Sequence, residues 1–107
     1  GESIPFTRNG SFPTYAEGYA YNMNQTKAYK FAQGSAGPKT ITLSASGNGL
    51  WVELFDSYGL WRWAEANTSS NGVISLNLPV GEYVVRVRVN PDYTRITGNL
   101  SYTLTVQ

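Results

Sequence analysis

The residues of this chain best suited to chemistry are aromatic rings and charged groups gathered between residues 51 and 63. Flat indole and phenol rings offer stacking surfaces, and a carboxylate or guanidinium beside them can hydrogen-bond the hydroxyl groups of a ligand. Sugars suit such a mixture, because a pyranose ring can lay its C–H face on an aromatic ring. The candidate ligand-binding residues are Trp51, Glu53, Tyr58, Trp61, Arg62 and Trp63.

Catalysis is not predicted, since the chain contains no histidine and no cysteine. These side chains supply many of the proton shuttles and nucleophiles that enzymes use at neutral pH. The seven acidic residues form no recognisable catalytic pair in the sequence. We therefore expect no catalytic residues and a protein that is not an enzyme.

The composition predicts one folded module over residues 1–107 and argues against two classes of partner. Charged residues make up 14% of the chain, the net charge is +1, and the basic residues are scattered. Nucleic acid is therefore not expected as a partner, because its binding needs a positive groove. A membrane is not expected either, since no apolar run reaches the roughly 18 residues of a spanning helix.

Apolar residues recur at every second position through most of the chain after residue 27, which is typical of strands with one buried face. Turn residues such as glycine, proline and asparagine separate these runs. The predicted strands cover residues 28–32, 40–46, 50–55, 60–64, 72–78, 82–90 and 99–106. Short strands of this kind predict an all-β fold, a two-sheet antiparallel β-sandwich. Residues 1–27 are expected to be an irregular segment packed on it.

The turn after residue 55 decides where the second and third tryptophans point, and two registers are open. A four-residue loop over 56–59 would pair Glu53 with Arg62 and turn Trp61 and Trp63 toward the core. This loop is favoured, because the alternative buries Arg62 without a partner, at a cost of several kcal/mol as a rough figure.

The alternative is a three-residue loop over 57–59, which slips the second strand by one residue and reverses its faces. Trp61 and Trp63 would then join Trp51 in one outer platform, while Arg62 would turn inward. Trp51 faces outward in both registers and is therefore the best single candidate for contact with a ligand.

The strand at 82–90 carries two further predictions. Tyr83 lies in phase with the valines of this strand, so we expect it in the core, as we do Tyr102 in the last strand. Arg86 and Arg88 lie on the opposite face and are expected to be solvated.

Four pieces of this pattern, in this order and spacing, resemble a known family. The pieces are Tyr29-Lys30-Phe31, Leu50–Asp56 followed by Gly59, Leu78–Val87 and Tyr102–Val106. They are similar to the opening Y-x-F strand, the L-x-L-x-L strand with its D-x-x-G turn, the L-x-x-G-x-Y-x-v-x-V segment and the closing Y-x-L-x-V strand of the bacterial pre-peptidase C-terminal domain. The resemblance covers residues 28–106.

The resemblance implies a small, jelly-roll-like β-sandwich that is secreted and extracellular and that accompanies the catalytic domain of a parent enzyme. Polysaccharide, or collagen and other fibrous proteins, are the partners that it implies, since members of the family target such polymers. Some members also hold calcium near the N-terminus. The N-terminal acids here are only Glu2 and Glu17, which do not support such a site. We therefore expect no metal site and no cofactor, with calcium left open as the alternative.

These observations predict a non-catalytic carbohydrate-binding module that targets a secreted enzyme to a polysaccharide through surface aromatics. Two alternatives remain open. The same aromatic face could bind collagen or another protein substrate, or the chain could be a structural or folding-aid domain of a secreted peptidase, with its aromatic residues in the core.

Overall fold

The computed structural model describes residues 1–12, 26–46, 49–89 and 100–107, and these residues form eight strands and no helix. The strands are β1 (Phe6–Phe12), β2 (Thr26–Gln33), β3 (Gly37–Ala45), β4 (Leu50–Asp56), β5 (Arg62–Asn67), β6 (Val73–Leu78), β7 (Gly81–Val89) and β8 (Leu100–Val106). Within these ranges there is accordingly no helix long and apolar enough to cross a membrane.

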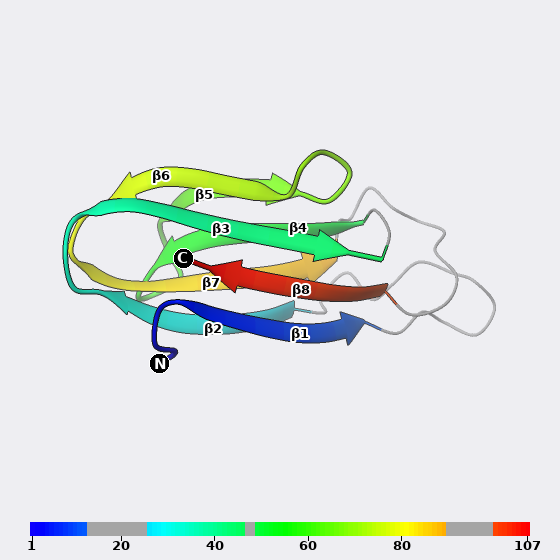
Figure 1. Ribbon diagram of the computed structural model, residues 1–107, viewed down its shortest axis with the longest axis horizontal. Coiled ribbons are helices and arrows are strands. Elements are labelled where there is room, and N and C mark those ends of the chain that lie inside the picture. The colour runs from blue at the N-terminus through cyan, green and yellow to red at the C-terminus, as the bar shows by residue number, and fades with distance from the viewer. Residues whose placement is uncertain (13–25, 47–48, 90–99) are drawn as a thin grey trace.

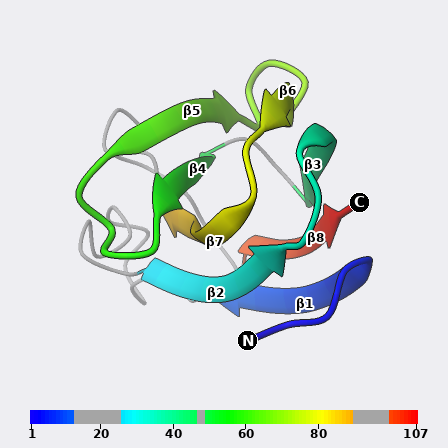
Figure 2. The same cartoon turned by 90° about the vertical axis from the view of Figure 1, so that its left-hand side faces the viewer.

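The first four strands pair in reverse order with the last four, and every pairing is antiparallel. β1 pairs with β8, β2 with β7, β3 with β6 and β4 with β5. The chain is therefore one long hairpin rolled into two sheets, ordered β1-β8-β3-β6 and β2-β7-β4-β5. Figure 1 shows the sheets face to face, and Figure 2 views them from one end. This arrangement is a jelly roll, so the predicted all-β, jelly-roll-like antiparallel sandwich is confirmed.

The core lies between the two sheets and follows the period-two pattern of the strands. Leu50, Val52 and Leu54 of β4 are fully buried and pack among the inward side chains of the other strands. Tyr83 and Tyr102 are 4% and 3% exposed, which confirms the prediction that both belong to the core. All seven predicted strands are present, with shifted bounds.

The N-terminal segment corrects a prediction. The sequence predicts an irregular segment over residues 1–27, whereas residues 6–12 form β1, which pairs with β8 at the edge of its sheet. Phe6 and Phe12 at its two ends are buried in the core. The residues between them are polar or glycine, and they hide the period-two pattern from sequence analysis. Residues 13–25 lie outside the described ranges.

Gly10 lies opposite Tyr102 in the β1–β8 ladder, and the tyrosine ring fills the space beside it. A Cβ atom on Gly10 would lie 2.4 Å from that ring. The ring cannot move aside freely, because it stacks on Phe12 with centroids 5.8 Å apart and its hydroxyl lies 2.6 Å from the hydroxyl of Tyr29. Since Tyr29 belongs to β2, the hydroxyl contact also joins the two sheets.

We expect Gly10→Ala to lower the free energy of unfolding by about 1–3 kcal/mol, because the new methyl group must displace the Tyr102 ring. Gly37→Ala is the matched control, since a Cβ atom at that strand position meets no atom within 4 Å. The control should leave stability unchanged or raise it by up to about 1 kcal/mol. Urea denaturation followed by fluorescence measures both variants, and equal effects would contradict the close packing at Gly10.

Candidate functional site

The β4–β5 hairpin contains a bulge that the sequence analysis missed. Phe55 pairs with Arg62 and Leu54 pairs with Ala64, so Trp63 is one extra residue between the two pairs. A bulge of this kind lets one strand carry two residues opposite one of its partner and bends it locally.

This register corrects both sequence-based alternatives. The connection runs over residues 57–61, which is longer than either predicted loop. Arg62 reaches the Glu53 carboxylate, as the four-residue loop predicts, but the residue directly opposite Glu53 is Glu65. Trp61 is 66% exposed and not buried. Trp61 is exposed because it lies in the connection, before β5 begins at Arg62. The bulge at Trp63 places Arg62, and not Trp63, opposite Phe55.

Asp56 holds the backbone of this connection in one conformation. Its Oδ1 atom accepts hydrogen bonds from the backbone N–H groups of Tyr58, at 3.2 Å, and Leu60, at 3.0 Å. Its backbone carbonyl accepts from Gly59 at 3.0 Å, and its own N–H donates to the carbonyl of Trp61 at 3.0 Å. Gly59 has a φ of 72°, a left-handed conformation that glycine adopts without strain.

The same hydrogen bonds stabilise the ionised form of the Asp56 side chain. The backbone N–H of Leu60 contributes most, and together with other N–H groups of the loop it lowers the pKa of Asp56 below its ordinary value. The loop is therefore held most firmly when this carboxylate is charged.

The aromatic tip, defined as Tyr58, Leu60 and Trp61, projects its side chains into solvent. These residues are 84%, 84% and 66% exposed. Trp63 is 39% exposed, and its ring packs edge-on against Tyr83, with centroids 6.1 Å apart. Large apolar side chains gathered on one exposed hairpin are typical of an interaction surface.

Sequence analysis named Tyr58 and Trp61 but missed Leu60, the aliphatic member of the tip. Leu60 directly follows the turn residue Gly59, a position that could have identified it as part of the loop. The prediction instead placed it in a strand beginning at residue 60, whereas β5 begins at Arg62.

Glu53 is the centre of an ionic cluster on the outer face of the β2-β7-β4-β5 sheet. Its side chain is nearly inaccessible, because three arginines surround it. Arg86 donates to Oε1 from Nε at 3.1 Å and from Nη2 at 2.9 Å, and Arg88 donates to the same oxygen at 2.8 Å. Arg62 donates to Oε2 at 3.2 Å and also reaches Glu65 at 2.9 Å. The prediction that Arg86 and Arg88 are merely solvated is therefore wrong.

Aromatic rings extend this cluster along the face. The guanidinium of Arg88 lies 4.1 Å from the ring centroid of Trp51, and that of Arg86 lies 4.7 Å from the ring centroid of Phe55. Each contact is a cation–π interaction, and each covers part of an aromatic ring that would otherwise face solvent. Trp51 is half-buried as a result, and the Nε1 atom of its indole is buried without a hydrogen-bond partner.

Two opposing effects set the pKa of Glu53. Burial is the larger single effect and raises it, but the hydrogen bonds and positive charges of Arg86 and Arg88 together outweigh burial, so the pKa is lowered. The carboxylate is therefore ionised and fully paired at neutral pH.

The six predicted site residues thus fall into two groups. Tyr58, Trp61 and Trp63 are accessible at the hairpin. Trp51, Glu53 and Arg62 belong to the ionic cluster, where the side chains already contact one another. The structure does not bring the six together as one open platform.

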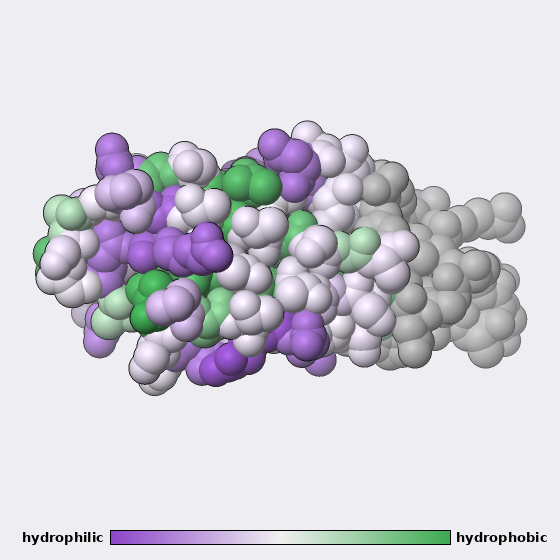
Figure 3. Space-filling view, in the orientation of Figure 1, coloured by the Kyte–Doolittle hydropathy of each residue, from purple (hydrophilic) through white to green (hydrophobic). Residues whose placement is uncertain are grey.

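The outer face of the other sheet, β1-β8-β3-β6, has a different character. Figure 3 shows it as a mixture of pale surface, of intermediate hydropathy, with hydrophilic areas and smaller apolar areas. Val73 is the one large apolar side chain exposed on the described part of this face, at 37%. The aromatic tip is therefore the more distinctive surface.

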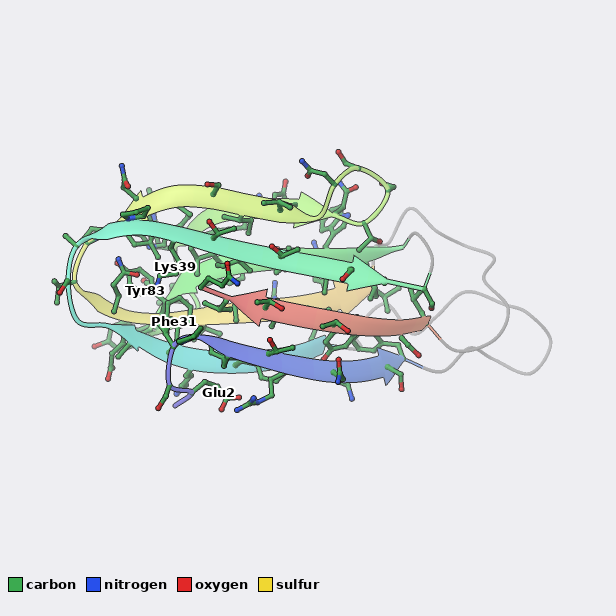
Figure 4. The ribbon with its side chains drawn as sticks, viewed as in Figure 1. Glu2, Phe31, Lys39 and Tyr83 are labelled. Atoms are coloured by element: carbon green, nitrogen blue, oxygen red, sulfur yellow. The ribbon has the colours of Figure 1, made fainter. Side chains whose placement is uncertain are left out.

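A cleft of about 390 Å³ opens beside the tip. Ser57 of the β4–β5 connection contributes to its wall, together with Tyr83 and Phe31, whose rings stack with centroids 5.6 Å apart. The N-terminal segment forms another wall, where the backbone N–H of Glu2 donates to the carbonyl of Lys30 at 2.7 Å. Figure 4 shows Glu2, Phe31 and Tyr83 at this end of the sandwich.

The described residues contain no group of three or more acidic residues, histidines or cysteines that could hold a metal ion. Glu2, one of the two acids considered for calcium, pairs with Arg8. Glu17 lies outside the described ranges.

No family model matches the chain, and no curated protein matches its sequence. Among solved structures, the pre-peptidase C-terminal domain of a collagenase from Bacillus anthracis has a TM-score of 0.71 at 21% identity, over 97% of this chain and 90% of that one. PliG from Aeromonas hydrophila, a periplasmic inhibitor of g-type lysozyme, has a TM-score of 0.64 at 15% identity, over 96% and 86%. PliG from Salmonella Typhimurium has a TM-score of 0.56 at 20% identity, over 96% and 86%.

These similarities show a shared fold. The resemblance to the pre-peptidase C-terminal domain, first seen in four sequence pieces, is confirmed at that level, because nearly all of this chain superposes on such a domain.

We expect Glu53→Gln to lower the free energy of unfolding by about 2–3 kcal/mol, because it leaves three neighbouring arginines without their shared charge partner. Glu65→Gln is the matched control, since the Glu65 carboxylate is exposed and pairs with Arg62 alone. The control should lower the free energy of unfolding by less than about 1 kcal/mol. Urea denaturation at neutral pH compares the two, and a small effect at Glu53 would show that the cluster contributes little.

Acid should destabilise the protein through Glu53. The folded carboxylate has a lowered pKa, so it binds a proton less tightly than in the unfolded chain, where the value is about 4.3. Its contribution is therefore complete above that value and is lost as pH falls through the folded pKa. Glu53→Gln should lose less stability than the wild type between about pH 7 and pH 3. The free energy of unfolding of the variant should still fall somewhat in acid, since Asp56 also has a lowered pKa. Equal losses in the variant and the wild type would exclude Glu53 as a cause of the acid sensitivity.

Proposed function

We propose that this chain is a non-catalytic binding module that attaches to a protein surface through the aromatic tip. The observation that carries the proposal is the exposure of Tyr58, Leu60 and Trp61 on a loop whose backbone Asp56 holds in place. Tyrosine and tryptophan give large contact areas at a low cost in conformational entropy, and they are enriched among the residues that dominate protein interfaces.

A protein is favoured over a polysaccharide by the state of the polar groups around the tip. Binding of sugar hydroxyls needs free hydrogen-bonding side chains beside the rings. Glu53 and Arg62, the residues predicted for that role, are occupied by each other and by further charged partners. The aliphatic Leu60, at the centre of the tip, adds a contact that suits an apolar protein surface better than a sugar.

The comparisons support a role in recognising proteins outside the cytoplasm. One similar fold is a domain of a collagenase, and another inhibits lysozyme in the periplasm. By analogy, we infer that the chain acts in a secreted or periplasmic protein beside a catalytic domain, and collagen is the first partner to test.

A polysaccharide is the second candidate, and the exposed indole of Trp61 favours it. This indole, with Tyr58 nearby, could stack on sugar rings, although with few hydrogen bonds such contact would be weak.

The aromatic tip should be required for binding and dispensable for folding. We expect Trp61→Ala and Tyr58→Ala to change the free energy of unfolding by no more than about 0.5 kcal/mol, since both side chains are exposed. Each should weaken partner binding at least about tenfold. Immobilised collagen and g-type lysozyme, with insoluble cellulose and chitin as the sugar panel, test both candidates by biolayer interferometry and pull-down.

Val73→Ala is the matched control, because it removes an exposed apolar side chain from the other sheet. Protein binding that is lost with Trp61→Ala and kept with Val73→Ala supports the proposal. Retention on a sugar polymer with the same dependence supports the second candidate instead. Binding that neither tip variant weakens would place the contact surface elsewhere.

A further inference from the structure

The charges of the ionic cluster on the β2-β7-β4-β5 sheet do not balance. Glu53 accepts hydrogen bonds from Arg62, Arg86 and Arg88, and Glu65 accepts one from Arg62. Among the described residues, Arg86 and Arg88 form no ion pair with any other carboxylate. The cluster therefore sets three positive charges against two negative ones, which leaves a surplus of one positive charge.

The ion pairs use only part of each guanidinium, which has several N–H groups on its nitrogens. Arg62 reaches both of its carboxylates through Nη1, so its Nε and Nη2 atoms make no hydrogen bond with the described residues. Arg86 uses Nε and Nη2, which leaves Nη1, and Arg88 uses Nε alone. Each arginine thus keeps donors for a further acceptor.

These remaining donors are accessible. The side chains of Arg62, Arg86 and Arg88 are 45%, 37% and 20% exposed. Within the described ranges, the one buried side-chain nitrogen without a hydrogen-bond partner is Nε1 of Trp51. The unused nitrogens of Arg86 and Arg88 are therefore not buried, and a ligand can approach them from solvent.

Arg62 and Arg86 lie close to each other beside Phe55. Arg62 donates to one oxygen of Glu53 at 3.2 Å, and Arg86 donates to the other oxygen of the same carboxylate at 2.9 Å. Arg62 also lies opposite Phe55 in the β4–β5 ladder, and the Arg86 guanidinium lies over the Phe55 ring. The two guanidiniums are therefore close enough for one further carboxylate to contact both.

We propose that Arg62 and Arg86 bind a carboxylate of the partner protein, supplied by an aspartate or glutamate side chain. The two oxygens of a carboxylate match the forked donors of a guanidinium. Its charge of minus one equals the surplus of the cluster, which favours a carboxylate over a neutral hydroxyl group and over a doubly charged phosphate.

The anion site adjoins the aromatic tip, because Arg62 directly follows Trp61 in the chain. Protein interfaces commonly surround an apolar centre with a polar rim, where complementary charges fix the orientation of the partner. A partner whose apolar patch covers the tip would thus present an acidic side chain at the edge of that patch. This identification of the carboxylate with the partner rests on the proposed function, whereas the anion site itself does not.

Replacement of chloride by propionate at constant ionic strength tests the anion site. Propionate has the carboxylate of a glutamate side chain, and the Nε–Hε signals of the ¹⁵N-labelled protein report on each arginine. We expect saturable shifts for Arg62 and Arg86 with a dissociation constant on the order of 10 mM, since exposed ion pairs are weak. Propionamide, which is neutral, should give none. Absence of saturable shifts with propionate, or equal shifts with propionamide, would overturn the proposal.

Two variants should change propionate binding in opposite directions. Glu65→Gln should strengthen it about two- to fivefold, because it frees Arg62 from a competing carboxylate and raises the surplus charge. This variant should fold, since the Glu65 side chain is 46% exposed. Arg62→Gln should weaken the binding by a similar factor. Unchanged or weaker binding by Glu65→Gln would overturn the proposal even if Arg62→Gln failed to fold.

Lys27→Gln is the matched control for the loss of a positive charge. Lys27 is exposed on β2, and its Nζ atom lies over the ring of Phe12, which belongs to the other sheet. The variant should bind propionate like the wild type. A loss equal to that of Arg62→Gln would show attraction by net charge alone and would overturn the site.

Trp61→Ala should leave the propionate titration unchanged, so the two proposals fail separately. Absence of propionate binding overturns the anion site alone, and partner binding that is independent of Trp61 overturns the proposed function alone. With a partner that does bind through the tip, Arg62→Gln should weaken binding about fivefold or more at low salt. Unchanged partner binding by Arg62→Gln would overturn the identification of the carboxylate with that partner.

Discussion

The Glu53 carboxylate joins three strands of one sheet, and the placement of the aromatic tip depends on it. Glu53 lies on β4, Arg86 and Arg88 lie on β7, and Arg62 lies at the first position of β5. A buried carboxylate is costly unless its oxygens are fully paired, and here both are. The cluster therefore fixes β5 against β4 at the base of the hairpin, just where the bulge would otherwise leave its register loosely defined.

Because of the cluster, the aromatic rings on the face and those at the end of the sandwich have different roles. On the face, guanidinium groups cover Trp51 and Phe55, so these rings stabilise the sheet and present little free surface. At the end, Asp56 uses backbone hydrogen bonds to hold a loop whose large side chains gain nothing from the core. Rings that stabilise the fold and rings that are free to bind are thus separated by only a few residues along one hairpin.

Sequence analysis found most of the fold, because seven strands show the period-two pattern and the jelly-roll order follows from the family resemblance. It missed β1, because the residues between Phe6 and Phe12 are polar or glycine and the Tyr102 ring fills the space beside Gly10. It found the segment that contains the candidate site, but it did not predict which of those side chains are accessible and which belong to the ionic cluster. A single bulge at Trp63 sets which side chains face outward. The ionic cluster depends on the register of β4 against β7, which places Glu53 opposite Arg86 although the two are far apart in the chain. One sequence does not reveal that register.

The strand order shows why one end of the sandwich matters more than its faces. In a jelly roll the β2–β3, β4–β5 and β6–β7 connections leave the sandwich at the same end, because successive strands run in opposite directions along it (Figure 2). Residues 33–39, the aromatic tip and Val80, which is 63% exposed, therefore gather there despite their distance in sequence. The core ends there as well, so the polar residue Lys39 can continue the inward pattern of β3 without any gap in the interior.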